Sequence, residues 1–550
     1  MAVVEISHPH LNELVGKELS VEELEGEGSM LGVLFEDSEE DKLEVEVEPN
    51  RPDLLSVEGI ARALRGFFDV ETGAVDYPVE DGDFTVEVDS SVNNVRRHIA
   101  CAVVTDLDLD EAARNSIIQL QEKLTETYGR KREKIAIGLH DAEQLASDIV
   151  YEAVEPDAVS FVPLGRDEEM TPAEILEEHE KGEEYGWILE DEDRYPLLRD
   201  AEGQVLSMPP VINGVVTEVD EDTDTIFLDV TGTSRQEVET ALNIVVAALH
   251  ERGGTIESVD VDGQRMPDLE PELMEVDPGY VRDVSGLHDL SASGIVEQLE
   301  AMRYDASVES GELVVEVPAY RADVMHAYDV IEDVAIGYGY NSIEPEIPDV
   351  ATIGGETQMQ VFQDALRDVM VGVGGEECMT FILSNREKLF DRMETGEEDV
   401  AAMANPLTED YTVVRNWVLP SLMAVLGENT HNRYPQRLFE VGKCTELSRD
   451  ADTGAEDRAK LAYVSAHSDA GFSEVRGVLQ TVAKQLGIDL SVEETEHGSF
   501  ADGRCGRIVV DGDDAGVIGE VSDTVRSNWE VDMPVAAFEV DVETLRNAAT

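Results

Sequence analysis

The chain has 550 residues, and its 122 acidic residues against 40 lysines and arginines give a formal charge of −82. Like charges repel over a Debye length of about 8 Å at physiological ionic strength but only about 3 Å in 1 M salt, so this charge predicts a halophilic protein of a salt-rich cytosol. At such salt the charge does not exclude a nucleic-acid partner. Apolar runs recur along the chain and argue against disorder.

The four cysteines lie far apart without a CxxC pair, which excludes a disulfide framework and a zinc site. The first residues lack the basic and apolar regions of a secretory leader, and no run of about 18 apolar residues occurs. These features predict a soluble, cytoplasmic protein without a membrane partner.

Residues 1–88 are expected to form a small α/β domain. Alternating apolar residues predict strands at 42–49 (KLEVEVEP) and 84–89 (FTVEVD). An amphipathic helix is predicted at 54–68 (LLSVEGIARALRGFF), with Ser56 as its N-cap.

Residues 89–265 are expected to form a second α/β domain. Strands are predicted at 98–107, 135–140 and 225–232, and helices at 115–129 and 235–253. The polar stretch 171–194 is interpreted as a surface excursion.

Residues 266–346 are expected to form a third domain in which two helices flank a strand pair, which is typical of a winged helix. Residues 347–550 combine amphipathic helices with strands spaced as in an antiparallel sheet. The predicted fold class is therefore α+β with four domains.

An acidic segment in the third domain raises the question of a metal site. Asp329, Glu332 and Asp333 share one helix face, and Asp323 lies where the preceding strand ends. Such like-charge pairs cost a few tenths of a kcal/mol each unless a cation neutralises them, and Mg²⁺ prefers oxygen ligands. In so acidic a chain, however, triplets of this kind also arise on solvated helices, as at 174–178. Both interpretations stay open on the residues alone.

Two further features allow a functional or a structural interpretation. The basic cluster Arg130, Lys131, Arg132 and Lys134 could meet phosphate or simply favour a helix C-terminus. Ser207 and the strand-end residues Asp229, Thr231 and Thr233 could line a polar pocket, or serve as turns and caps. No motif of a self-contained catalytic site is present in the sequence.

Several longer motifs together resemble the phenylalanyl-tRNA synthetase beta subunits of archaea and the eukaryotic cytosol. They are VEPNRPDLLSVEGIARAL, RKREKIAIGLHD, YPLLRDAEGQVLSMPPVIN with FLDVTGT, VPAYRADVMHAYDVIEDVAIGYGYNSIEP, and NPLTEDYTVVRNWVLPSLMAVLGENTHNRYPQRLFEVGKC. The resemblance runs from end to end of the chain and points to a halophilic archaeon as its source.

The resemblance implies a ligase that attaches phenylalanine to its tRNA with ATP, as an assembly of two alpha and two beta chains. Residues 347–550 resemble a class II synthetase catalytic domain, but the C-terminal stretch lacks the glycine-rich motif that ends in an arginine. The aminoacylation site is therefore expected in the alpha subunit, and Arg415 is expected to serve the core or an interface.

The resemblance also implies roles for two sets of residues. Residues 89–265 resemble the module that hydrolyses tyrosyl-tRNA, with pocket positions at Leu198, Ser207, Asp229 and Thr231; Asp229 and Thr231 are assigned to recognition or water positioning. Residues 266–346 resemble the family's B5 domain, whose Mg²⁺ ligands correspond to Asp323, Asp329, Glu332 and Asp333.

Two alternatives from other functional classes remain. One is a purely structural synthetase subunit whose editing pocket has decayed. The other is a magnesium-dependent phosphodiesterase that uses the carboxylates between Asp323 and Asp333. DNA binding by the winged-helix-like domain is not expected, because that domain has no basic recognition helix.

Overall fold

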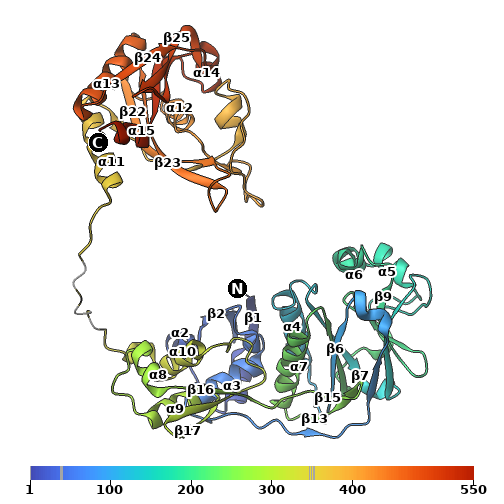
Figure 1. Ribbon diagram of the computed structural model, residues 1–550. Helices are drawn as coiled ribbons and strands as arrows, with labels where there is room; N and C mark the ends of the chain where they lie inside the picture. Colours follow the sequence, from blue (N-terminus) through green and yellow to red (C-terminus); the bar gives the residue numbers. More distant parts are fainter. Residues whose placement is uncertain (1, 38–40, 346, 348–349, 351–352, 550) are drawn as a thin grey trace. The chain divides into compact units, whose positions relative to one another are not determined.

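The structure is a computed structural model that describes residues 2–37, 41–345, 347, 350 and 353–549. It divides into two compact units, Met1–Ile347 and Pro348–Thr550 (Figure 1). The expected mixture of helices and several sheets is confirmed. No helix among the described residues is long and apolar enough to cross a membrane.

The first unit begins with a three-stranded antiparallel sheet in the order β1-β3-β2. Its strands are β1 (Ala2–Ser7), β2 (Val33–Asp37) and β3 (Lys42–Val47), followed along the chain by the predicted amphipathic helix α3 (Val57–Phe67). Helices α1 (His8–Val15) and α2 (Val21–Gly26) lie between β1 and β2 in the chain. The Ser56 hydroxyl accepts a hydrogen bond from the Gly59 amide at 3.1 Å, which confirms Ser56 as the N-cap of α3.

Two larger sheets follow. One has the order β11-β10-β9-β8-β5-β14-β15 and the other β4-β13-β6-β12-β7. The seven strands of the first are β5 (Thr85–Val88), β8 (Asp148–Val154), β9 (Tyr195–Asp200), β10 (Val205–Met208), β11 (Ile212–Asn213), β14 (Val259–Val261) and β15 (Gln264–Met266). The five of the second are β4 (Val79–Glu80), β6 (His98–Thr105), β7 (Ile135–Asp141), β12 (Ile226–Gly232) and β13 (Thr255–Glu257). Strands β4 and β5, placed in the first domain by sequence, thus pair with strands of the second.

Helices α4 (Glu111–Glu126) and α7 (Arg235–His250) pack on the five-stranded sheet (Figure 1). The polar stretch 171–194 forms α5 (Pro172–Glu178), α6 (Glu180–Tyr185) and a short 3₁₀ turn. Its apolar residues Ile175 and Leu189 are buried in a small core beside β9 and β10, so the stretch is more than a surface excursion. Two buried residues suffice to dock a short amphipathic element whose other side chains are charged.

The last part of the first unit has a three-stranded sheet, β16-β18-β17, and three helices. These elements are β16 (Glu272–Val276), α8 (Pro278–Ser285), α9 (Ala292–Ala301), β17 (Asp305–Glu309), β18 (Glu312–Val317) and α10 (Ala327–Tyr338). The predicted helix, strand pair and helix are all present. The third strand, β16, was not predicted from sequence, because its residues ELMEV show no apolar alternation and all but one are exposed or half-buried.

A buried ionic network lies beside this sheet and the turn before α3. Arg51 donates two 2.8 Å hydrogen bonds to Asp53, and Arg62 lies 3.7 Å from the same carboxylate and over the Tyr320 ring. Burial opposes ionisation of Asp53, but the neighbouring arginines, Arg321 included, lower its pKa to about 2. The carboxylate is therefore an ionised, paired part of the core at neutral pH.

The second unit is a seven-stranded sheet in the order β19-β22-β23-β27-β26-β25-β24, in which only the β19–β22 pair is parallel. Its strands are β19 (Glu376–Glu377), β22 (Gln436–Leu447), β23 (Ala455–Ala466), β24 (Leu490–Glu494), β25 (Phe500–Val510), β26 (Asp513–Val521) and β27 (Val535–Asp541). A small separate pair joins β20 (Leu383–Ser384) to β21 (Val413–Val414).

Helices bury apolar residues against this sheet in two separate cores. The first core includes side chains of α11 (Gln358–Gly372), α13 (Phe472–Leu486) and α15 (Val542–Ala549). The second includes α12 (Leu419–Glu428) and α14 (Asp523–Asn528). The expected antiparallel sheet with flanking helices is therefore confirmed.

Candidate functional site

A cavity of about 490 Å³ lies in the first unit, where the edge strand β7 of the five-stranded sheet meets β10 and β11. Its walls come from β7, the chain from Ser207 to Gly214, two segments at 164–166 and 179–181, and Asp229 of β12. A concave shape and a mixed polar and apolar lining are typical of a site for a small organic group.

Asp229 projects from a strand that is buried along its whole length. Opposite it stand Gly138 on β7 and Cys101 on β6. A β-carbon at Gly138 would lie 1.9 Å from Asp229 Oδ2, so glycine leaves the space that the carboxylate occupies. Burial and the Asp229 charge raise the pKa of the Cys101 thiol well above its usual value. Asp229 is thus a carboxylate built into an apolar sheet and reaching the cavity.

His140 holds the Asp229 carboxylate in place. Its Nε2 lies 2.8 Å from Asp229 Oδ2, and its Nδ1 lies 2.8 Å from the Thr217 hydroxyl, which also lines the cavity. All three side chains are buried. A buried acidic group whose partner is itself fixed by a hydrogen bond has a defined orientation, as general bases and water-positioning groups require.

Ser207 provides a second polar group in the same cavity. Its side chain is only 2% exposed, and its Oγ atom has no hydrogen-bond partner among the described residues. A buried hydroxyl without a partner is costly, so a group bound in the cavity would gain by supplying the missing hydrogen bond.

The other two predicted pocket residues do not line the cavity. Leu198 is fully buried in the main core of the unit. The Thr231 hydroxyl accepts a 3.0 Å hydrogen bond from Arg96 Nε, and Arg96 also donates to the Thr231 carbonyl at 2.9 Å. Burial lowers the pKa of Arg96 to about 10. Thr231 therefore shares its sheet face with Asp229 but serves to hold a buried arginine.

The basic cluster predicted from sequence borders the same cavity. Arg132 lines it, donates to the carbonyls of Pro210 (3.2 Å) and Val211 (2.9 Å), and lies over the Tyr185 ring at 4.1 Å. Lys134 pairs with Glu237 at the start of α7. Arg132 thus ties the turn after α4 to the chain that forms the cavity wall.

The predicted metal ligands divide into two groups. Asp323, Asp329 and Glu332 line one cavity of about 270 Å³ beside the Pro49–Pro52 turn. Asp333 is buried instead, where it accepts hydrogen bonds from Tyr304 and from Arg321 Nη2 (2.6 Å). Asp329 accepts the amides of Met325 and His326 and so caps α10.

Arg321 already neutralises part of this acidic group. It donates to both oxygens of Asp323, at 2.8 and 2.7 Å, as well as to Asp333. Within the described ranges no three acidic, histidine or cysteine side chains are arranged to ligate one ion. Burial and the charges of Asp333, Asp329 and Asp323 nevertheless raise the pKa of Glu332, so negative charge there is not fully compensated. The carboxylate oxygens of Asp323, Asp329 and Glu332 are of the kind that Mg²⁺ prefers as ligands. Asp333 instead accepts hydrogen bonds from Arg321 and Tyr304.

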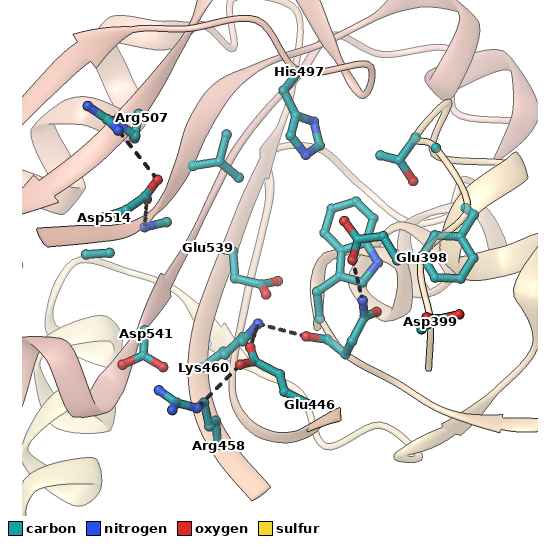
Figure 2. A pocket seen from close by; sticks show the side chains of 18 of the residues that line it. Glu398, Asp399, Glu446, Arg458, Lys460, His497, Arg507, Asp514, Glu539 and Asp541 are labelled. Atoms are coloured by element: carbon teal, nitrogen blue, oxygen red, sulfur yellow. Dashed lines mark hydrogen bonds and ion pairs between the residues drawn. The ribbon is translucent and has the colours of Figure 1, made fainter. Parts of the chain in front are cut away.

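The second unit has a cavity of about 1260 Å³ (Figure 2). Arg458 and Lys460 lie within 4 Å of Glu446, and Arg507 pairs with Glu493 and Asp514. The lining also includes Glu398, Asp399, Glu446, Asp514, Glu539 and Asp541. An ATP site needs cations directed at phosphates. Here Arg458, Lys460 and Arg507 are paired with carboxylates, the lining is rich in carboxylates, and the remaining arginine, Arg449, is exposed.

Arg415 is a core residue of this unit. It is 1% exposed and donates to the Lys443 carbonyl, to the Thr380 and Ser421 hydroxyls, and to Glu440 Oε1 at 2.6 Å. A β-carbon at Gly442 would lie 2.4 Å from Arg415 Nη2, so the glycine of the FEVGK strand makes room for the guanidinium. These contacts occupy the groups that an ATP ligand would need.

Sequence reasoning did not single out His140, Thr217 or Arg96, although each contacts a predicted pocket residue or its partner. His140 carried one detectable signal: it stands two residues after Gly138 in an otherwise apolar strand, and so shares a face with it. Arg96 is 135 residues from Thr231 in the chain, and the pairing of β6 with β12 brings the two together. Thr217 lies in a 3₁₀ turn before β12 that packs against β7.

Comparison with known proteins agrees with this architecture. Residues 274–340 match the family described as tRNA synthetase B5 domain, and residues 343–542 match the phenylalanyl tRNA synthetase beta chain CLM domain. The phenylalanine–tRNA ligase beta subunits of Pyrococcus abyssi and Thermococcus kodakarensis are 43% and 44% identical and align over 99% and 98% of this chain and over 100% and 98% of their own lengths.

The crystal structure of an N-terminal fragment of the phenylalanyl-tRNA synthetase beta subunit from Pyrococcus horikoshii is also similar, with 42% identity and a TM-score of 0.59 over 62% of this chain and all of the fragment. The shared sequence covers both units, including the strands that carry Asp229 and the helix that carries Glu332. The chain belongs to the family of phenylalanine–tRNA ligase beta subunits.

Proposed function

We propose that this chain is the beta subunit of a ligase that, with an alpha subunit, attaches phenylalanine to its tRNA and converts ATP to AMP and diphosphate. The observation that carries the proposal is the identity of 43% over 99% of the chain. Aminoacylation itself is assigned to the alpha subunit, because the cavity of the second unit has paired cations and Arg415 is committed to the core.

An exposed apolar patch on the second unit supports a protein partner. Around the β20–β21 pair, Met379 is 97% exposed and Phe381 75%, and Ile382, Leu383 and Tyr411 are also exposed. Grouped apolar side chains of this size on a highly charged protein are typical of an interface. We assign the patch to the alpha subunit, in an assembly of two alpha and two beta chains.

The cavity at Asp229 is proposed to be the site where the ester bond between a wrongly attached tyrosine and the phenylalanine tRNA is hydrolysed. A binding site rejects an added hydroxyl by shape only about a hundredfold, so a second site that recognises the hydroxyl is required. Ser207 offers a free hydrogen-bonding group, and Asp229 is positioned to orient a water molecule. The water oxygen bonds to the tyrosyl carbonyl carbon, the ester bond to the ribose breaks, and the ribose oxygen takes up a proton.

Three of the predicted metal ligands are proposed to hold Mg²⁺, namely Asp323, Asp329 and Glu332, with Asp333 holding Arg321 beside them. The ion would neutralise the charge that raises the pKa of Glu332. In that role it would stabilise the third domain and any surface it shares with the alpha subunit.

Magnesium is expected to raise the melting temperature of the chain in KCl, because an ion that binds only the folded state stabilises it by about 2.7 kcal/mol at 100 times its Kd. Asp323→Asn with Glu332→Gln should abolish the shift in a calorimetric titration. The matched control Glu177→Gln with Glu178→Gln removes the same charge from α5 and should keep it. Equal shifts in both double variants would contradict the metal assignment.

The test of the ligase and editing roles is reconstitution with the cognate alpha subunit and tRNA in molar KCl with Mg²⁺. Phenylalanylation by the mixture but by neither subunit alone would support the beta-subunit role. Deacylation of tyrosyl-tRNA by the same mixture would support editing, whereas charging without deacylation would favour a purely structural subunit. Cleavage of RNA by the chain alone with Mg²⁺ or Mn²⁺ would favour a phosphodiesterase.

Two broader expectations stay predictions. The halophilic habitat rests on the charge of −82, and the cytoplasmic location on the lack of leader-like and long apolar runs in the sequence. Lack of DNA binding agrees with helices α9 and α10, which contain no lysine or arginine.

A further inference from the structure

The turn after α4 has an uncommon backbone conformation. Arg130, Lys131 and Arg132 have φ angles of +50°, +54° and +67°. Residues with a β-carbon rarely adopt this left-handed conformation. Glycine adopts it readily, and asparagine and aspartate more often than other residues. The chain has 43 glycines and 122 acidic residues, yet it places three of its 40 cations at these consecutive positions. Backbone geometry therefore does not explain the residue types, and the explanation must lie in the side chains.

The turn is tied to both neighbouring elements. The amides of Lys131 and Arg132 donate to the carbonyls of Glu126 and Thr125 at 2.9 and 3.0 Å, and the amide of Lys134 donates to Gly129 at 2.9 Å. A β-carbon at Gly129 would lie 2.4 Å from the Thr125 carbonyl. The backbone of the turn is thus held by α4 and the start of β7.

The side chains of Arg130, Lys131 and Arg132 have different surroundings. Arg132 points to the cavity wall, through its hydrogen bonds to Pro210 and Val211. Arg130 and Lys131 are exposed, and neither side chain forms a hydrogen bond or an ion pair with any residue that the structure describes. Both follow Glu126, the last residue of α4, and the dipole of the helix favours an exposed cation there only weakly. Arg130 acts on Glu237 only through space, where its charge helps to lower the pKa of that carboxyl. Two exposed cations without a direct partner among the described residues therefore precede Arg132, which lines the cavity.

The surroundings indicate what these cations bind. Glu122, Glu180 and Glu218 line other parts of the cavity and would repel an anion there. The lining also includes Lys181, which is paired with Glu184, and Arg166, which donates to the Glu178 carbonyl. An elongated anion that reaches the cavity is therefore favoured at the basic turn, and exposed lysine and arginine side chains are common ligands of nucleic-acid phosphates. We infer that Arg130 and Lys131 bind backbone phosphates of the single-stranded 3′ end of a tRNA whose terminal aminoacyl nucleoside enters the cavity. This inference rests on the proposed editing function.

The test compares the Arg130→Gln, Lys131→Gln double variant with the unmodified chain, each assembled with the alpha subunit. For tyrosyl-tRNA deacylation, KM should rise about tenfold and kcat stay within about twofold, because the phosphate contacts act in binding. The slope of log kcat/KM against log salt should become shallower by about 1.4, since each single-strand phosphate contact contributes about 0.7. A tyrosyl ester of adenosine, which has no phosphate, should be hydrolysed equally by both assemblies.

The Lys42→Gln, Lys484→Gln variant is the matched control, because it removes two exposed lysines from other domains. An unchanged KM and salt slope in the Arg130→Gln, Lys131→Gln variant would overturn the inference. An equal loss of activity of that variant on the phosphate-free ester would also overturn it. If the unmodified assembly hydrolyses neither substrate, the editing proposal fails by itself. Fluorescence anisotropy with an RNA minihelix that has a single-stranded 3′ end then decides separately: a tenfold weaker affinity supports the basic turn, and an equal affinity overturns it.

Discussion

Asp229→Asn is expected to slow hydrolysis of tyrosyl-tRNA by the assembled ligase by about 10² to 10⁴-fold, the usual range for a positioned acid–base group. Phenylalanylation should be unaffected, since the site assigned to it lies in the alpha subunit. The variant keeps the side-chain shape beside Gly138 but removes the carboxylate that His140 holds at 2.8 Å. The measurement is single-turnover deacylation, with misacylated product followed during charging with tyrosine.

Asp224→Asn is the matched control. Asp224 is an exposed carboxylate two residues before β12, and it does not line the cavity. A melting curve for each variant shows whether a loss of deacylation activity comes from a loss of folded protein. If Asp229→Asn deacylates as fast as the unmodified assembly and folds normally, the cavity is not an editing site and the structural alternative gains support.

Arg415→Met is expected to lower the free energy of unfolding of the second unit by about 3 to 5 kcal/mol, the usual cost of leaving one member of a buried ion pair alone. Glu440, which is 4% exposed, would then keep only its Thr380 hydrogen bond at 2.5 Å. Urea unfolding in constant salt can be followed by tryptophan fluorescence. In a Trp187→Phe background, Trp417 and Trp529 of this unit are the remaining tryptophans.

Two further variants make this expectation specific. Arg415→Met combined with Glu440→Gln should recover most of the loss, because no unpaired charge then stays buried. Arg458→Met removes a more exposed cation from the cavity of Figure 2 and should cost about 1 kcal/mol or less. A small effect of Arg415→Met on unfolding, together with loss of charging activity, would instead point to a role for Arg415 in ligand binding.

Much of the local structure followed from sequence, because its causes are local. Ser56 caps α3 as predicted, since a serine ahead of an amphipathic run meets the free amides of the first turn. Strands β6, β7 and β12 were evident from their apolar, β-branched composition. Elements with weaker patterns were missed or misplaced. Strand β16 has no apolar alternation, and β4 and β5 pair with β13 and β14, which lie more than a hundred residues further along the chain.

The candidate sites show the same division. Of the four pocket positions that the family resemblance implies, Ser207 and Asp229 line the cavity, whereas Leu198 and Thr231 do not. The type of a residue and its position in the sequence do not determine which cavity its side chain faces. The cavity that a strand residue faces depends on strand register. In the register of β12, Asp229 contacts His140 and Thr231 contacts Arg96.

The sequence by itself determined the acidity of the protein, its amphipathic elements and its family, because composition, periodicity and extended motifs are properties of the chain. Only the tertiary structure decided that Arg321 lies between Asp323 and Asp333, and that Arg415 pairs with Glu440. It also decided that the turn of Arg130 and Lys131 adjoins a cavity, which the next residue of that turn, Arg132, lines. The pairing of charges is a long-range property. Which carboxylate meets which cation is set by the packing of helices and strands that are remote in sequence.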